Sequence, residues 1–130
     1  GAYFRLGQIW FLNENYEKAL EHLGKYVDLR KEVLNKSPSL SALTLIALAR
    51  KNSGKSYELK VIKELINETD DIGYSTYFRL YKLFDDFKYL KNAHEKLEDR
   101  ANKLEETFKK KFYDYPIPNQ IIEYQKNINS

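Results

Sequence analysis

The stretch Ala2–Gly7 reads AYFRLG, and it returns 74 residues later as TYFRLY at Thr76–Tyr81. With this shift the two segments align without a gap from residue 3 to residue 23. A separation of 74 residues is two units of 37, and an internal period of about 20 to 50 residues indicates a repeat architecture. Seven aligned pairs are identical: Tyr3/Tyr77, Phe4/Phe78, Arg5/Arg79, Leu6/Leu80, Ala19/Ala93, Glu21/Glu95 and Leu23/Leu97.

Apolar residues recur at helical spacing through most of the chain, and no segment alternates long enough to be a confident strand. We therefore expect an all-α fold. The expected helices cover 2–12, 16–34, 40–51, 57–67 and 75–87, then one helix from about 88 to 112 and a short terminal helix at about 118–128. The long helix rests on one apolar stripe of about 24 residues, made of Leu90, Ala93, Leu97, Ala101, Leu104, Phe108 and Phe112. Asn15 and Ser39 are the expected N-caps, and Gly54 is the expected left-handed C-cap.

The composition bounds the class of protein. Hydrophobic residues make up 42% and charged residues 32%, which is typical of a globular domain. The net charge is +3 with both signs interspersed, so we expect no nucleic-acid partner. The longest uncharged apolar run, 37–49, has 13 residues and is too short for a bilayer helix of ~20, so we expect no membrane partner. The chain lacks Met and Cys. We therefore interpret it as a single domain, 1–130, excised from a longer cytoplasmic protein.

The first unit matches the spacing of a known helical hairpin. A hairpin needs small residues where its helices approach closely, and large apolar residues around that contact. The matching residues are Tyr3, Leu6, Gly7, Trp10, Tyr16, Ala19 and Leu23. This pattern resembles the tetratricopeptide repeat (TPR) family. The resemblance implies a right-handed superhelical array of about three helical hairpins plus a short C-terminal helix, with units at about 1–36, 39–68 and 74–113.

The later units follow the pattern less closely. The third unit has Tyr81 where the family usually has Gly, so its helices are expected to lie further apart. The middle unit is degenerate, because Arg50 occupies the place of an aromatic residue. Leu43, Ile46, Ala47 and Gly54 fit the pattern there. The C-terminal part is similar to repeat arrays appended to bacterial signalling proteins such as cyclases, kinases and transcription regulators.

Several short motifs suggest chemistry, but each has a simpler explanation. The segment Ala49–Ser56 matches a relaxed phosphate-binding loop, yet no parallel sheet can be assembled around it. His22 and His94 lack a second ligand at metal-binding spacing. The acidic pair Asp85-Asp86 lies at a helix end, where Asp caps a helix. We therefore expect no catalytic residue, no metal and no cofactor, and a protein that is not an enzyme.

The TPR resemblance implies a concave groove that holds a peptide or a partner helix. The positions that would line it are Phe4, Arg5, Gln8, Phe11 and Leu12 in the first unit, Leu45 and Leu48 in the middle unit, and Phe78, Arg79, Lys82 and Asp85 in the third. Arg favours bidentate pairing with carboxylates, so an acidic partner is expected. The family's clamp for chaperone tails needs Lys and Asn where this chain has Phe4 and Gln8. The competing interpretation is that the Phe residues pack between hairpins and the Arg residues are solvated.

Two functions remain open from the sequence. The first is a protein-interaction or scaffold module of a larger regulatory protein that binds a protein or peptide. The alternative is a self-association element that forms a homodimer through the long final helix and the aromatic faces.

Overall fold

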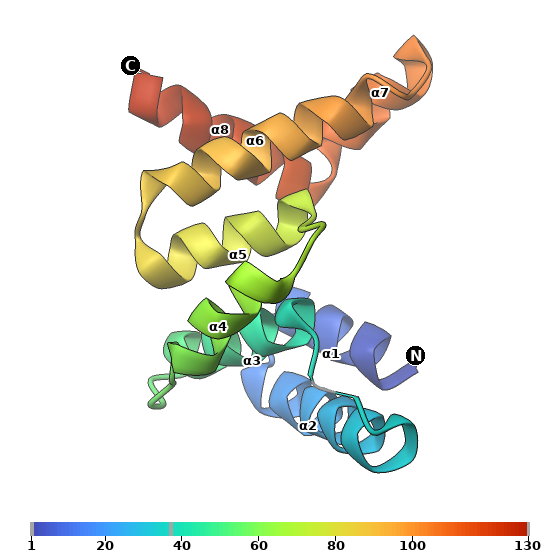
Figure 1. Ribbon diagram of the computed structural model, residues 1–130. Coiled ribbons are helices and arrows are strands. Elements are labelled where there is room, and N and C mark those ends of the chain that lie inside the picture. Colours follow the sequence, from blue (N-terminus) through green and yellow to red (C-terminus); the bar gives the residue numbers. More distant parts are fainter. Residues whose placement is uncertain (1, 37, 130) are drawn as a thin grey trace. The chain divides into compact units, whose positions relative to one another are not determined.

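A computed structural model describes residues 2–36 and 38–129 of the chain. The described residues form helices and no strands, so the all-α prediction is confirmed. The helices fall into two compact units, residues 1–70 with the first four and residues 71–130 with the last four (Figure 1). Their bounds are α1 (Ala2–Leu12), α2 (Tyr16–Leu34), α3 (Leu40–Asn52), α4 (Lys60–Glu68), α5 (Tyr74–Phe84), α6 (Phe87–Ala101), α7 (Glu106–Asp114) and α8 (Pro116–Asn129).

The first unit is built on the hairpin of α1 and α2. Helix α3 packs against both of them, and α4 packs against α3. Both expected N-caps are confirmed: the Asn15 side chain accepts from the Lys18 amide at 3.2 Å, and the Ser39 hydroxyl accepts from the Ala42 amide at 3.1 Å. The core of this unit contains Ala19, Leu23 and Leu45, with Phe4, Trp10, Phe11 and Ile46 packed against it.

Gly7 is the point at which α1 and α2 approach most tightly. A Cβ atom built on Gly7 would lie 2.6 Å from Leu23 Cγ and 2.7 Å from Leu23 Cδ2. Ala19 and Leu23 are both fully buried at this contact. The predicted roles of Gly7 and Ala19 in closing this hairpin are therefore confirmed.

The second unit repeats the hairpin with α5 and α6. Helix α8 packs against α6, and α7 packs against both. Ala93 and Leu97, the repeat equivalents of Ala19 and Leu23, are also fully buried. The core of the unit contains Phe78, Leu90, Ala93, Leu97, Ala101, Phe112 and Ile121.

The prediction of one long helix from about 88 to 112 is wrong. Helix α6 ends at Ala101, and α7 begins at Glu106 after an extended Glu105 with ψ 152°. The spacing of the apolar stripe did not reveal the break, because the residues on both sides of the turn keep the same phase. Phe108 shows the difference: it lies on the predicted stripe but is 56% exposed.

Other helix bounds differ from the prediction for local reasons. Helix α5 ends at Phe84 instead of 87, because Asp85 adopts a left-handed conformation with φ 53°. Asp86 then caps α6 by accepting from the Lys88 amide at 3.0 Å, which confirms the capping role of this pair. Helix α8 begins at Pro116 because proline is favoured at the first helical position, and it forces the preceding Tyr115 to be extended.

Candidate functional site

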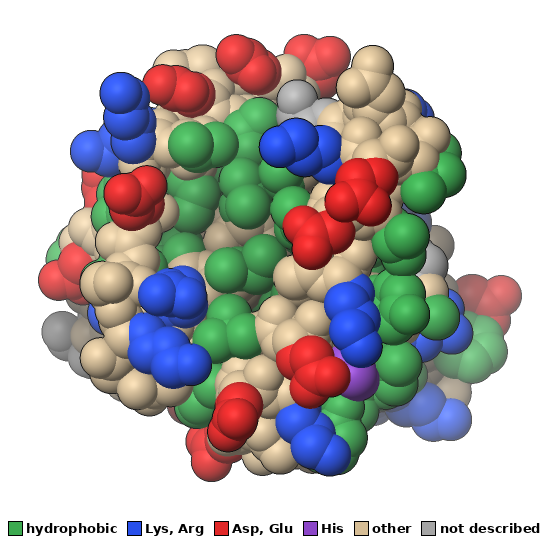
Figure 2. Space-filling model, turned by 90° about the horizontal axis from the view of Figure 1, so that it is seen from below, with side chains coloured by type: hydrophobic (Ala, Val, Ile, Leu, Met, Phe, Trp, Pro, Cys, Tyr) green, Lys and Arg blue, Asp and Glu red, His purple; other side chains and the backbone are tan. Residues whose placement is uncertain are grey.

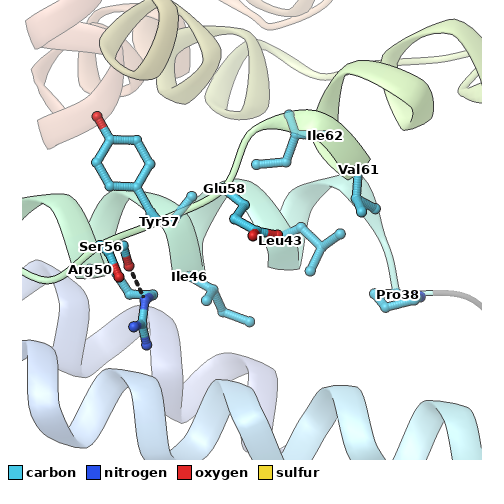
Figure 3. A pocket seen from close by; sticks show the side chains of 10 residues that line it. Pro38, Leu43, Ile46, Arg50, Ser56, Tyr57, Glu58, Val61 and Ile62 are labelled. Atoms are coloured by element: carbon cyan, nitrogen blue, oxygen red, sulfur yellow. Dashed lines mark hydrogen bonds between the residues drawn. The ribbon is translucent and has the colours of Figure 1, made fainter.

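A hollow over one face of α3 is the strongest candidate for a functional site in the first unit. Its volume is about 760 Å³, within the range of about 300–1,000 Å³ that is common for ligand sites. Figure 3 shows Leu43, Ile46 and Arg50 projecting to the same side of α3. The lining residues are Pro38, Leu43, Ile46, Ala47, Arg50, Ser56, Tyr57, Glu58, Val61 and Ile62.

The α3 part of the lining follows helical geometry. Leu43, Ile46, Ala47 and Arg50 are spaced i, i+3, i+4 and i+7, so they form one stripe along the helix. Seven residues at 1.5 Å each make this stripe about 10 Å long. Three of its four residues are apolar, and Arg50 ends it with a charge.

The hollow exists because α4 begins late. A helix was predicted from Tyr57, but α4 begins at Lys60 and has only 9 residues. In the first hairpin, Leu23 of α2 fills the space over Gly7 of α1. The position that corresponds to Leu23 on α4, 40 residues later, is the exposed Lys63. We therefore attribute the open face of α3 to the absence of a large apolar side chain over Ala47.

The turn after α3 holds the rim of the hollow in place. Gly54 has φ 75°, as the sequence predicted, and its amide donates to the Lys51 carbonyl at 3.2 Å. The Lys55 amide donates to the Arg50 carbonyl at 2.8 Å, which completes a Schellman motif. The Arg50 Nε–H then donates to the Ser56 carbonyl across the turn (Figure 3). These bonds direct the chain away from α3 and delay the start of α4.

The same turn argues against the phosphate-binding loop. The Ala49–Ser56 motif would need a strand before it and free backbone amides around a phosphate. Here α3 precedes the turn, and the Ser53, Gly54 and Lys55 amides donate to carbonyls at its end. The motif therefore marks a helix C-terminus.

Arg50 is the one cation among the residues that line the hollow. Its Nε–H is engaged with Ser56, while the two Nη groups of the guanidinium have no partner among the described residues. A guanidinium carries five N–H donors, so Arg50 retains the two-pronged edge that pairs with a carboxylate. Glu58 supplies the one acidic side chain of the lining and is exposed.

Charged residues surround an apolar surface on this molecule. Figure 2 shows hydrophobic side chains gathered in a hollow, with Lys, Arg, Asp and Glu side chains of both signs around them. An apolar centre with a polar, charged rim is the usual anatomy of a protein-binding surface.

The structure distributes the eleven predicted groove residues differently from the prediction. Four are buried: Leu45, Leu48, Phe78 and Arg79. Leu45 and Phe78 belong to the cores of their own units, so these two side chains offer a partner no surface. The exposed ones are Arg5, Leu12 and Asp85, and the half-buried ones are Phe4, Gln8, Phe11 and Lys82.

Within each unit the predicted residues meet each other rather than a ligand. Phe4 packs on Tyr26 with ring centroids 5.1 Å apart, and Phe11 packs on Tyr16 at 5.5 Å. Lys82 lies with its Nζ 4.5 Å from the Phe78 ring centroid and donates to Gln120 Oε1 at 3.4 Å. Burial lowers the pKa of Lys82. These contacts match the competing interpretation, in which the aromatic residues pack between helices.

The two repeated arginines differ in their surroundings. Arg5 is exposed, whereas Arg79 is buried and donates to the Thr76 hydroxyl at 3.3 Å. Burial lowers the pKa of Arg79 to about 10, so its guanidinium stays charged at neutral pH. Identity of sequence at the repeat position therefore does not extend to exposure.

The α3 residues of the hollow were visible in the sequence but interpreted as hairpin packing. The signal that distinguished them was the degeneracy of the middle unit, with Arg50 in an aromatic position and Lys63 in place of Leu. A charged residue at a packing position indicates that the packing partner is missing there.

The histidines have local partners. His94 lies 3.5 Å from Glu98 on the next turn of α6, and His22 packs near the Tyr3 ring with centroids 6.4 Å apart. Among residues 2–36 and 38–129, no three His, Cys, Asp or Glu side chains gather as a metal site would require. In the same residues, no helix is long and apolar enough to cross a membrane.

Comparisons with known proteins leave the geometry as the basis for inference. No protein-family model, curated protein or solved structure matches the chain.

Proposed function

We propose that the chain is a non-catalytic protein-interaction module of the TPR type, part of a larger regulatory protein, that binds a peptide or partner helix. The observation that carries this proposal is the open apolar hollow on α3. Its lining combines an apolar stripe with Arg50 and Glu58 at its edges. The binding surface we propose is therefore this hollow rather than the eleven residues expected from the repeat positions.

The TPR assignment is part of the proposal. It is supported by the contact of Gly7 with Leu23 and Ala19 and by the buried equivalents Ala93 and Leu97. We further propose that the three hairpins α1/α2, α3/α4 and α5/α6 form one array in the complete protein. The alternative of self-association lost one of its supports, because the long final helix is broken after Ala101.

The experiment is a selection of displayed helical peptides against the whole chain, followed by affinity measurement on two variants. Val61→Asp places a charge in the hollow, whereas Val33→Asp places one on α2, at a residue that is 71% exposed and does not line the hollow. We expect selected peptides to lose at least about tenfold in affinity with Val61→Asp and to keep it with Val33→Asp. Peptides that tolerate both changes, or a selection that yields no binder, would contradict the proposed function.

A further inference from the structure

We infer that the occupant of the α3 hollow is an amphipathic helix with one large apolar residue and one carboxylate residue a single turn apart. This inference rests on the proposed function and names the chemistry of the partner. The apolar residue would lie on Ala47, and the carboxylate would pair with Arg50.

The helical form of the occupant follows from the first hairpin. Gly7 on α1 is the seat for Leu23 of the facing helix, with the built Cβ only 2.6 Å from Leu23 Cγ. Ala47 holds the corresponding place on α3, and it borders open space instead of a side chain. A small residue in the middle of a helix face allows a second helix to approach to about 8–10 Å between axes. The open face of α3 therefore has the shape that a second helix fits.

The apolar part of the occupant is set by the residues beside Ala47. Leu43 and Ile46 are half-buried, and Val61 across the hollow is 49% exposed. A Leu or Phe side chain on the partner would cover all three and remove their apolar surface from water. A polar side chain in the same place would be desolvated without a hydrogen bond.

The carboxylate is set by Arg50. Ala47 and Arg50 are three residues apart, so the partner's acidic residue must lie about one turn from its apolar anchor. Ser56 engages only the Nε–H, which fixes the guanidinium beside the hollow and leaves the Nη edge for a bidentate pair. An apolar wall next to this pair lowers the local dielectric and strengthens the bond. A neutral or basic residue at this place of the partner would leave the guanidinium desolvated and unpaired.

The test uses the full chain and blocked 16-residue alanine-based helices as probes. Each probe contains one Leu and, three or four positions before or after it, a Glu, a Gln or a Lys. Binding is measured by fluorescence anisotropy. We expect the best Glu probe to bind at least about tenfold more tightly than its Gln twin, as a charge-assisted bond predicts. Arg50→Glu should reverse the preference in favour of the Lys probe.

A matched control and a folding check complete the design. Lys51→Glu changes the charge of the next residue on α3, which is exposed and does not line the hollow. It should leave the Glu preference unchanged, and circular dichroism should give the same helix content for both variants. Arg50→Lys keeps the charge without the fork and should retain part of the preference.

Equal binding of Glu and Gln probes, together with loss of both in Val61→Asp, would overturn the carboxylate inference and leave the proposed function intact. Dodecanoate that competes with the Leu of the probes while all probes bind without charge preference would also overturn it. If no probe binds and the displayed-peptide selection fails as well, the proposed function fails with it.

Discussion

The α1/α2 hairpin and the α3/α4 hairpin start from similar first helices and end in opposite states. On α1, Gly7 receives Leu23, and the joint is closed so tightly that a Cβ has no room. On α3, Ala47 faces a hollow of about 760 Å³ because α4 is short and carries Lys63 at the matching place. The difference teaches that a degenerate repeat can convert a packing face into a binding face.

The largest expected effect comes from removing the side chain that closes the first hairpin. Leu23 is fully buried, so Leu23→Ala should destabilise the chain by about 2–5 kcal/mol through lost burial and a residual cavity. Leu43 lines the open hollow and is half-buried, so Leu43→Ala should cost less than about 1.5 kcal/mol. Urea unfolding followed by circular dichroism measures both. Equal losses for the two variants would show that the hairpins do not differ in packing.

Adding one methyl group at Gly7 should have the next largest effect. Gly7→Ala forces Leu23 to move, and overpacking of this kind costs about 1–3 kcal/mol. Gly24→Ala is the matched control, because it lies in the interior of α2 and a Cβ there meets nothing within 4 Å. The control should stabilise the chain by about 0.5–1 kcal/mol. A Gly7→Ala variant as stable as the wild type would contradict the close approach of α1 and α2.

The turn that opens the second hairpin offers a smaller effect. Gly54 has φ 75°, and an L-residue in this conformation costs roughly 1–2 kcal/mol. Gly54→Ala should therefore lower the free energy of unfolding by about that amount. Gly73→Ala is the control, because Gly73 has φ −76° and open space around it. Thermal unfolding of the two variants decides the point, and identical midpoints would mean that the Gly54 turn is not held in this shape.

The smallest change in stability is expected at Ala47. Its side chain borders the hollow, so Ala47→Leu can extend into it and should change the free energy of unfolding by less than about 1 kcal/mol. The same substitution fills the seat for a partner and should weaken binding of the Leu–Glu probe by at least about tenfold. Probe binding that is unaffected by Ala47→Leu would place the partner elsewhere.

The sequence predicted the closed hairpin well and the open one poorly. The bounds of α1 and α2, the Asn15 cap and the roles of Gly7 and Ala19 all followed from local pattern, since each depends on neighbours in one hairpin. The hollow depends on where α4 begins, which is decided by the Gly54 turn and the Arg50–Ser56 hydrogen bond. Apolar periodicity does not register such a turn.

The break between α6 and α7 escaped prediction for the same reason. The apolar stripe keeps its phase across the turn, and only the 56% exposure of Phe108 reveals that the helix does not continue. The burial of Arg79 was equally out of reach, because sequence identity with the exposed Arg5 suggested the same environment. Both cases depend on what packs against a residue, which the repeat pattern alone does not specify.

The central claim is that the face of α3 is open where the face of α1 is closed. Paramagnetic relaxation of side-chain methyl groups by a soluble, neutral nitroxide measures this directly in the full chain. The account predicts strong relaxation of the Leu43 and Ile46 methyl groups and protection of the Leu23 and Leu45 methyl groups, which lie in the core of the same unit. Equal protection of all four residues would contradict it.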